Sequence, residues 1–350
     1  MTKEIISTGG VPNGAVTGAL PAPAAEAPAL ADDALLEAET RLCEIPVDMH
    51  GWRIDRALAQ LIPEFSRSYL QQLMVEGAVQ LRGAPALKPA ARIHVGERLQ
   101  VELRPTQQAM AFVPQAMDLD VVFEDAHLLV IHKPAGLVVH PAAGHWSGTL
   151  LNGLLAHHAA AASLPRAGIV HRLDKDTSGL MLVGKSRVAV DALVRAIAAR
   201  EVHREYLALA HGRWKGAVEL GVDQPIGRDI HNRLRMAVVR PEAISGKPAQ
   251  TTIRLLDGND TTSLVACKLH TGRTHQIRVH MAWLGHPLVG DTLYGGKPIW
   301  GMQRQALHAT RLRLLHPTTG KSLAFLSPPP ADFQDAVAQA GLHYNEAQLG

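Results

Sequence analysis

The chain has 350 residues, of which 47% are hydrophobic and 19% are charged. This length is sufficient for two domains, one of them large. The two cysteines, Cys43 and Cys267, are too few and too far apart for a disulfide framework, so we expect a cytoplasmic protein. The first residues lack a basic segment followed by an apolar core, and no apolar run of about 18 residues occurs. We therefore expect neither a signal peptide nor a membrane span.

The charge is distributed unevenly along the chain. The formal net charge is +3, but residues 1–48 hold two basic and eight acidic residues, a net of −6, which leaves +9 for residues 49–350. A basic body suits a polyanionic partner, because phosphate contacts supply most of the non-specific affinity for nucleic acid. An ordinary, mildly basic enzyme would show the same balance, so charge alone does not choose between these classes.

The first 40 residues are rich in Ala, Pro and Gly, and they contain no aromatic residue. Such a segment cannot bury enough apolar surface to fold, so we predict that residues 1–40 form a disordered acidic tail.

A small unit is predicted over residues 49–104. Apolar residues between 54 and 62 recur at helical spacing, and Ser66 is a suitable N-cap for a second helix over 67–76. Strands are predicted over 79–81 and 99–103.

The segment FSRSYLQQLMVEGAVQLRG in this unit resembles the S4-type RNA-binding domain. The resemblance implies that arginines of the unit, Arg53 and Arg67 among them, contact RNA. The segment departs from the S4 pattern at Arg82, where Asn commonly precedes the turn glycine, so the turn geometry is left open. A small helical adaptor with solvated arginines would account for the same residues.

The larger domain is predicted over residues 118–330, between a linker over 105–117 and a C-terminal tail over 331–350. Strands are predicted over 119–123, 128–132, 206–210, 252–256 and 264–269, and helices over 149–157 and 187–200. A further helix, with Thr274 as its N-cap, is predicted through residue 284. Strands that follow one another without regular helical crossovers indicate an α+β fold with a mainly antiparallel sheet.

The stretch HRLDKDTSGL, residues 171–180, directly follows an apolar run that predicts a buried strand. It places Asp174 where a carboxylate is costly unless it is paired or used in chemistry. A strand end with a surface ion pair would also fit. The stretch resembles the signature of the RluA family of pseudouridine synthases, which modify ribosomal RNA: HRLD, two further residues, then TSG or TTG.

Other segments match the same family in the same order, so the resemblance covers about residues 49–328. These segments are KPAGLVVHP, HREYLAL, GRTHQIRVHM and RQALHATRLRLLHP.

The resemblance implies a chemistry for individual residues. Pseudouridine formation breaks the C1′–N1 bond of uridine and rejoins the base through C5, and glycosidases handle such a sugar centre with a carboxylate. Asp174 matches that carboxylate and either attacks C1′ or removes the C2′ proton; Asp176, the competitor within the motif, is interpreted as a turn or partner residue. Arg278 matches the charge partner that keeps the carboxylate ionised. Tyr206 matches the tyrosine to which stacking on the uracil and also proton transfer are assigned.

A stacked nucleotide hides its sugar, so the target uridine must first leave the RNA stack. The resemblance implies that Arg172 enters the gap left by the flipped base, since a guanidinium can stack and contact phosphate at once. A plain phosphate contact is the alternative. Lys133, His140 and Arg273 are further candidate RNA contacts.

No HExxH motif and no pair of CxxC motifs occurs, so we expect no metal site despite nineteen histidines. Phosphate-binding patterns such as GxxxxGK[ST] and GxGxxG are also absent, so we expect no nucleotide cofactor. The sequence predicts a cofactor-free, monomeric 23S rRNA pseudouridine synthase that acts on rRNA or on a precursor of the large ribosomal subunit. Within the family, the motifs are most similar to the member that modifies the helix 69 stem-loop. The alternative is an RNA-binding assembly factor of the large subunit, in which binding rather than catalysis matters.

Overall fold

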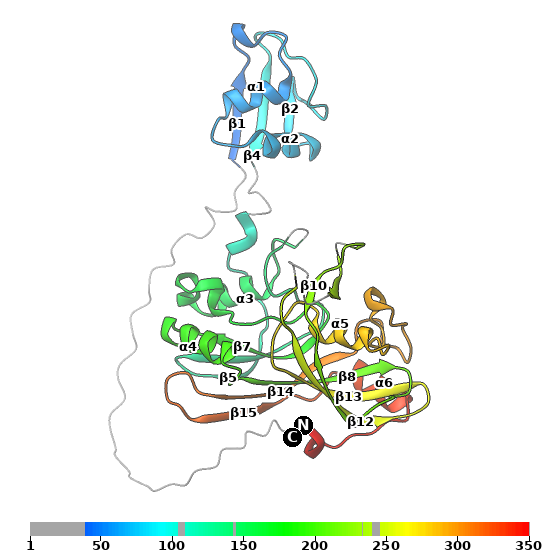
Figure 1. Cartoon of the computed structure of the whole chain (residues 1–350). Coiled ribbons are helices and arrows are strands. Elements are labelled where there is room, and N and C mark those ends of the chain that lie inside the picture. The colour runs from blue at the N-terminus through cyan, green and yellow to red at the C-terminus, as the bar shows by residue number, and fades with distance from the viewer. Residues whose placement is uncertain (1–38, 104–108, 143–144, 233, 240–245, 350) are drawn as a thin grey trace, which may run out of the picture. The chain divides into compact units, whose positions relative to one another are not determined.

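The computed structural model describes the chain except for residues 1–38, 104–108, 143–144, 233, 240–245 and 350 (Figure 1). The chain divides into two compact units, with the boundary in the sequence between Ala111 and Phe112. Almost all of the predicted acidic tail, and the first part of the predicted linker, lie outside the described residues. Within the described ranges, no helix has both the length and the apolar character needed to cross a bilayer.

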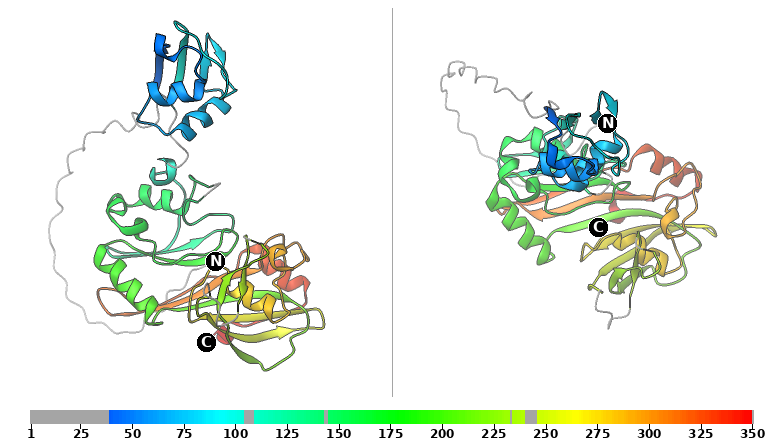
Figure 2. Two further views of the ribbon diagram at one scale, coloured as in Figure 1. Left: turned by 45° about the horizontal axis from the view of Figure 1, so that its top comes forward. Right: turned by 90° about the horizontal axis from the view of Figure 1, so that it is seen from above.

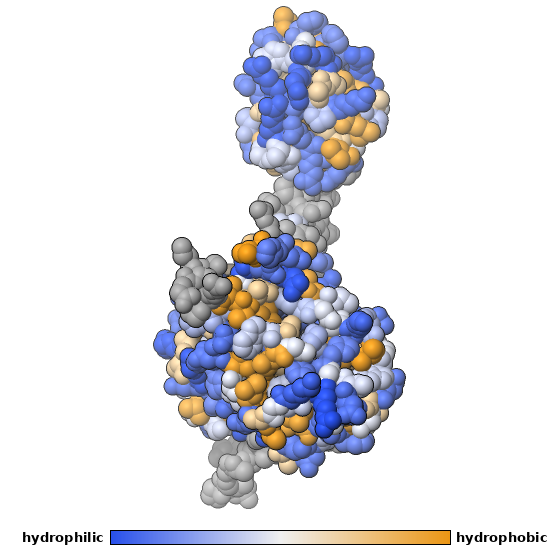
Figure 3. Space-filling view, turned by 45° about the vertical axis from the view of Figure 1, so that its right-hand side comes forward, coloured by the Kyte–Doolittle hydropathy of each residue, from blue (hydrophilic) through white to orange (hydrophobic). Residues whose placement is uncertain are grey.

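The N-terminal unit contains a four-stranded antiparallel sheet in the order β1–β4–β2–β3 and two helices. Its elements are β1 (Glu39–Glu44), α1 (Ile54–Leu61), α2 (Arg67–Val75), β2 (Val79–Leu81), β3 (Ala84–Pro85) and β4 (Arg98–Leu103). Both helices pack on the sheet through one apolar core, to which Ile54, Leu58 and Leu70 contribute. Hydrophilic side chains cover much of the face of this unit that Figure 3 shows.

The described part of this unit includes β1, which precedes the predicted start at residue 49 and pairs along its whole length with β4. Strand β1 was missed because its sequence, ETRLCE, has little apolar alternation, and Leu42 is 74% exposed. Backbone hydrogen bonds to β4 hold this edge strand in place, and Cys43 is its partly buried contact with the apolar core.

Two local predictions concern the turns of this unit. The hydroxyl of Ser66 accepts a hydrogen bond from the backbone N–H of Tyr69 at 3.3 Å, which confirms the predicted N-cap of α2. Between β2 and β3, Arg82 (φ 55) and Gly83 (φ 80) form a two-residue loop closed by the pair Leu81 and Ala84. Two successive positive φ values are those of a type I′ turn, so Arg82 takes the conformation that Asn adopts more readily.

The larger unit is built on a nine-stranded sheet. Its order is β5–β6–β7–β14–β8–β13–β12–β9, and β15 also pairs with β14. Strand β14 runs parallel to β7, and the other pairings within the described part of this sheet are antiparallel. The α+β class is therefore confirmed, with a mixed sheet. The strands are β5 (Asp120–Glu124), β6 (Leu128–Lys133), β7 (Ser178–Gly184), β8 (His203–His211), β9 (Glu219–Asp223), β12 (Gln250–Gly258), β13 (Thr262–Leu269), β14 (Leu307–Leu315) and β15 (Ser322–Leu326).

Helices cover both faces of this sheet (Figures 1 and 2). On one face, α3 (Leu150–His157) and α5 (Gln276–Trp283) share a core with Tyr206 and Ala208 of β8. On the other face, α6 (Ala331–Gln339) packs against Leu207 and Leu209 of the same strand, and α4 (Arg187–Ala198) packs against β6 and β7. Because side chains alternate along a strand, β8 supplies apolar residues to both faces. A short hairpin of β10 (Ile226–Arg228) and β11 (Met236–Val238) lies outside the main sheet.

Residues 331–350, predicted to be a C-terminal tail, contribute helix α6 to the larger unit. Phe333 of this helix is fully buried, together with Ala336 and Val337. The spacing of these three residues places them on one side of the helix.

We predict that Phe333→Ala lowers the free energy of unfolding by about 3–5 kcal/mol, because it leaves a cavity between α6 and β8. The matched control is Asp335→Ala on the exposed side of α6, which we expect to change stability by less than about 0.5 kcal/mol. Chemical denaturation of the two variants measures the difference. Equal stability of the two variants would contradict a structural role for α6.

Candidate active site

Asp174 lies in the loop that leads into β7, and its side chain is 15% exposed. The loop closes into a turn in which the backbone N–H of Thr177 donates to the carbonyl of Asp174 at 3.1 Å. Gly179 follows at the start of β7 with φ 116, and a Cβ there would lie 2.2 Å from the carbonyl oxygen of Ala309 on β14. A side chain at residue 179 would therefore push apart the two parallel strands whose pairing fixes the end of this loop.

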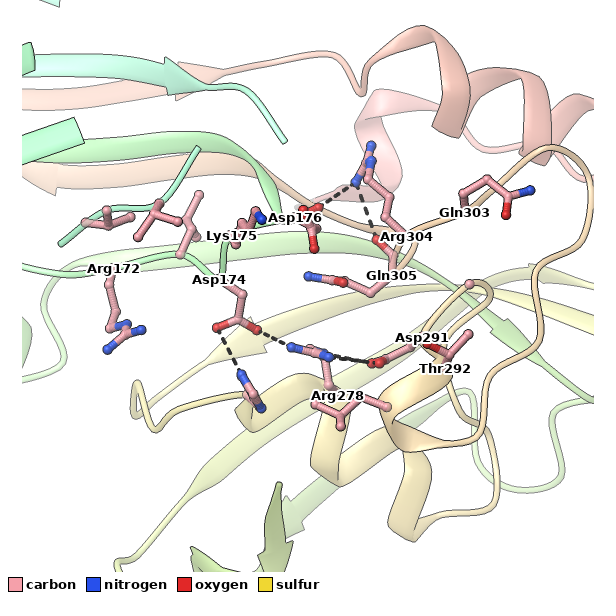
Figure 4. Close-up of a pocket in the computed structure, with 16 residues that line it drawn as sticks. Arg172, Asp174, Lys175, Asp176, Arg278, Asp291, Thr292, Gln303, Arg304 and Gln305 are labelled. Atoms are coloured by element: carbon pink, nitrogen blue, oxygen red, sulfur yellow. Dashed lines mark hydrogen bonds and ion pairs between the residues drawn. The ribbon is translucent and has the colours of Figure 1, made fainter. Parts of the chain in front are cut away.

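One guanidinium holds two carboxylates in the site (Figure 4). Arg278 of α5 donates from Nη1 to Asp174 Oδ2 at 3.0 Å, and it binds Asp291 through Nε at 2.7 Å and Nη2 at 2.8 Å. Burial alone would lower the pKa of Arg278, but its hydrogen bonds and charge interactions with Asp291 and Asp174 raise that pKa above its usual value. Arg278 therefore stays positively charged. Its two hydrogen bonds to Asp291 orient the guanidinium so that Nη1 faces Asp174.

His275 and Tyr294 complete the surroundings of Asp174. The Tyr294 hydroxyl accepts from the backbone N–H of Met236 at 2.9 Å and lies 2.8 Å from His275 Nδ1. The direction of this last hydrogen bond depends on the His275 tautomer, and the other ring nitrogen, Nε2, lies 3.9 Å from Asp174 Oδ1. Burial lowers the pKa of His275 in spite of the Asp174 charge, so the ring is neutral near pH 7.

Helix α5 begins at Gln276, after the predicted N-cap Thr274, because His275 adopts a left-handed conformation with φ 57. This conformation places the His275 ring beside Asp174. No local sequence pattern indicated a role for Asp291, His275 or Tyr294. His275 lies within the matched segment GRTHQIRVHM, but nothing local in the sequence indicates that His275 and Asp291 come close to Asp174 in the fold.

Asp174 and Arg172 line two cavities. The smaller cavity, about 420 Å³, is also lined by Arg278, Asp291 and Gln305. The larger cavity, about 800 Å³, is also lined by Tyr206, His140 and Arg273. Tyr206 is 4% exposed, and its burial raises the pKa of its phenol, so Tyr206 is neutral near pH 7. The structure thus brings the candidate carboxylate, tyrosine and exposed Arg172 around one hollow.

The candidate RNA contacts of the larger unit do not all face solvent. Arg172 and Arg273 are exposed, and His140 is half-buried. Burial and the charges of Arg172 and Arg166 lower the pKa of His140, so it is neutral near pH 7.

Lys133 corrects our expectation of an RNA contact, because it is fully buried. Its Nζ donates to the carbonyls of Pro134, Leu137 and Lys175 at 2.7–2.9 Å. Burial lowers the pKa of Lys133 to about 7, against the opposing charges of Asp176 and Asp174. With three acceptors around it and no exposed surface, this ammonium fixes loop backbone and cannot reach a phosphate.

In the N-terminal unit, Arg53 and Arg67 both bind Asp55, which is fully buried. Burial of Asp55 would raise its pKa, but hydrogen bonds from Arg53, Arg67 and Gln71 outweigh it and hold that pKa well below the usual range. The two arginine side chains stay 47% and 51% exposed. A single carboxylate thus holds two guanidinium groups side by side at the surface of this unit.

Comparison with known proteins assigns the chain to a family. A family model described as RNA pseudouridylate synthase matches residues 127–283. Ribosomal large subunit pseudouridine synthase D of Neisseria meningitidis is 47% identical over 324 residues, covering 87% of this chain and 84% of that protein. The protein of the same name from Vibrio parahaemolyticus is 46% identical over 297 residues, covering 81% and 89%. The solved structure of human RNA pseudouridylate synthase domain containing 4 aligns with a TM-score of 0.50 at 24% identity, covering 64% of this chain and 93% of that one, and it shares the fold.

The chain therefore belongs to the RluA family of pseudouridine synthases. Its enzyme class is isomerase, since pseudouridine formation rearranges uridine without adding or removing atoms.

We predict that Asp291→Asn lowers the single-turnover rate of pseudouridine formation by about 10- to 100-fold, because Arg278 loses the charged fork that orients it toward Asp174. Asp332→Asn is the matched control. Asp332 binds Nε and Nη2 of Arg304 in the same fork geometry, but it lies at the surface, so we expect a rate within about threefold of wild type. Equal rates for the two variants would contradict the role of Asp291.

Proposed function

We propose that this chain converts uridine to pseudouridine in 23S rRNA, with Asp174 as the reacting carboxylate. The observation that carries the proposal is the Asp174–Arg278–Asp291 arrangement beside two cavities. The names of the two relatives from Neisseria meningitidis and Vibrio parahaemolyticus support the choice of large-subunit rRNA.

The reaction needs one ionised carboxylate with an oxygen that is free of hydrogen bonds. Arg278 holds Asp174 Oδ2, whereas Oδ1 accepts no hydrogen bond from any described side chain and faces His275 Nε2 at 3.9 Å. Oδ1 is therefore the atom that attacks C1′ or takes the C2′ proton when the C1′–N1 bond breaks. The uracil then turns, C5 bonds to C1′, and the proton lost from C5 is replaced by one gained at N1.

Tyr206 supplies a flat, buried and neutral surface for the uracil, and its hydroxyl is a donor or acceptor for the proton that leaves C5. Arg172 is exposed and lines both cavities, which suits a side chain that replaces the flipped base in the RNA stack. Arg273 and His140 lie along the larger cavity, where we propose that they contact the RNA near the flipped nucleotide.

The finer target that we propose is the helix 69 stem-loop of 23S rRNA. The N-terminal unit binds the flanking RNA as an S4-type domain, and the exposed Arg53 and Arg67, held side by side by Asp55, support this role. The excess of nine positive charges over residues 49–350 favours a nucleic-acid partner.

We predict that Asp174→Asn abolishes pseudouridine formation but keeps the fold and RNA affinity within about threefold, because the amide can neither attack C1′ nor accept the C2′ proton. Tritium release from large-subunit rRNA labelled at C5 of uridine measures the reaction, and filter binding measures the affinity. Normal turnover by this variant would exclude Asp174 as the reacting group. Intact binding without release by wild type would favour the assembly-factor function instead.

We predict that removal of residues 1–104 weakens rRNA binding and reduces its salt dependence, while residues 112–350 still unfold cooperatively. The two units have separate apolar cores, and each phosphate contact that is lost removes about one released counterion from the salt slope. Affinity measured at several salt concentrations, with a thermal melt of the truncated chain, tests this. Unchanged affinity would contradict RNA binding by the N-terminal unit.

A further inference from the structure

Arg204 is a buried arginine of β8 that lines the larger cavity. It precedes Tyr206 by two residues, so the two side chains leave the strand on the same face. Its partner residue on β13 is Leu269, which lines the same cavity. Arg204 is 6% exposed, whereas the other arginines around this cavity are exposed at its mouth: Arg166, Arg172, Arg200 and Arg273.

Arg204 has no carboxylate partner in the part of the chain that the structure describes. Its Nε is enclosed without a hydrogen-bond acceptor, and none of the described side chains forms an ion pair with its guanidinium. The neighbouring Glu205 leaves the strand on the opposite face, where it binds Arg313 at 3.3 Å. Arg278, the comparable buried arginine, has two carboxylates. A buried cation without an anion is costly, which indicates that the anion arrives with the substrate.

The surroundings of Arg204 hold its guanidinium in place without neutralising it. A Cβ at Gly272 would lie 3.1 Å from Arg204 Nη1, so the loop after β13 packs closely against the guanidinium. His171, on the same cavity, accepts from the backbone N–H of Leu182 at 2.8 Å through Nε2, and its Nδ1 has no partner among the described residues. Burial and the charge of Arg204 lower the pKa of His171 to about 3, so the ring is neutral and carries its proton on Nδ1.

We propose that Arg204 is a further catalytic residue that binds a carbonyl oxygen of the flipped uracil and stabilises its negative charge when the C1′–N1 bond breaks. This role rests on the proposed function. When that bond breaks, its electron pair stays on the uracil ring, while C1′ bonds to Asp174 or C2′ loses a proton to Asp174. The charge leaves the ring when C5 bonds to C1′, as the Asp174–C1′ bond breaks or C2′ regains its proton. C5 then loses its proton and N1 gains one.

The burial of Arg204 favours the uracil over an RNA phosphate as its ligand. Tyr206, two residues along the same face, is the residue to which we assign uracil stacking, so a stacked ring lies beside Arg204. Four exposed arginines at the mouth of the cavity are available for phosphates, whereas Arg204 lies deeper. A buried cation aimed at developing charge lowers a barrier strongly, because water does not screen it.

The test compares two RNAs under single-turnover conditions, one with uridine and one with 5-fluorouridine at the target position. Fluorine stabilises the uracil anion, so a variant that lacks charge stabilisation should be partly rescued by it. For Arg204→Met we expect the uridine rate to fall by about 10²- to 10³-fold with RNA affinity within about threefold of wild type. With 5-fluorouridine, followed as loss of that nucleoside, the defect should shrink at least about tenfold. Arg204→Lys, which keeps the charge, should recover part of the uridine rate.

Arg273→Gln is the matched control for a phosphate contact. We expect it to weaken RNA binding and to affect both RNAs equally. If Arg204→Met behaves in the same way, Arg204 binds phosphate and the proposed role is wrong. If wild type converts neither RNA, the proposed function itself fails, and this role fails with it.

Protein stability separates a catalytic from a structural arginine. Arg204→Met keeps the length of the side chain and removes a buried, unpaired charge, so we expect the melting temperature to stay the same or rise. A clear fall in melting temperature together with the lost activity would show that Arg204 supports the fold and would overturn the proposal.

Discussion

The site depends on one guanidinium shared between two carboxylates. Asp174 and Arg278 are 104 residues apart in the chain, yet their side chains meet at 3.0 Å. Asp291 takes two nitrogens of Arg278 and fixes the plane of the group, and Asp174 receives the third nitrogen through one oxygen only. Two anions face one cation, so the cluster keeps an excess negative charge. An attack on a sugar carbon, or removal of its neighbouring proton, requires an ionised carboxylate with a free oxygen, and among the described residues Asp174 Oδ1 is such an oxygen.

The same loop is fixed a second time through its backbone. Lys133 binds the carbonyl of Lys175, the residue after Asp174, together with the carbonyls of Pro134 and Leu137. Burial of an ammonium is costly, and three carbonyl acceptors offset much of that cost. Arg278 therefore holds the side chain of Asp174, and Lys133 holds the backbone of the next residue. Together they orient the carboxylate before substrate binds.

Local patterns in the sequence predicted the features that depend on neighbouring residues. The helical spacing around Leu58, the N-cap at Ser66 and the α+β class all follow from residues that are close together in the chain. Strand β1 could not be predicted, because pairing with β4 holds it rather than an apolar pattern. The burial of Lys133 was also missed, because its acceptors include a carbonyl 42 residues away. Family resemblance named Asp174, Tyr206 and Arg278, whereas the role of Asp291 needed the folded chain.

Arg278, Lys133 and Arg204 are buried cations of the larger unit, and they differ in the groups that offset the cost of burying their charge. Arg278 has carboxylates and Lys133 has carbonyls, so each is satisfied within the fold. Arg204 has neither in the described chain, although it lies as deep as Arg278. A protein keeps such a charge only where binding or catalysis compensates for its cost. Because Tyr206 and Arg204 share one face of β8, the strand that presents the stacking surface for the base also presents an unneutralised cation beside it.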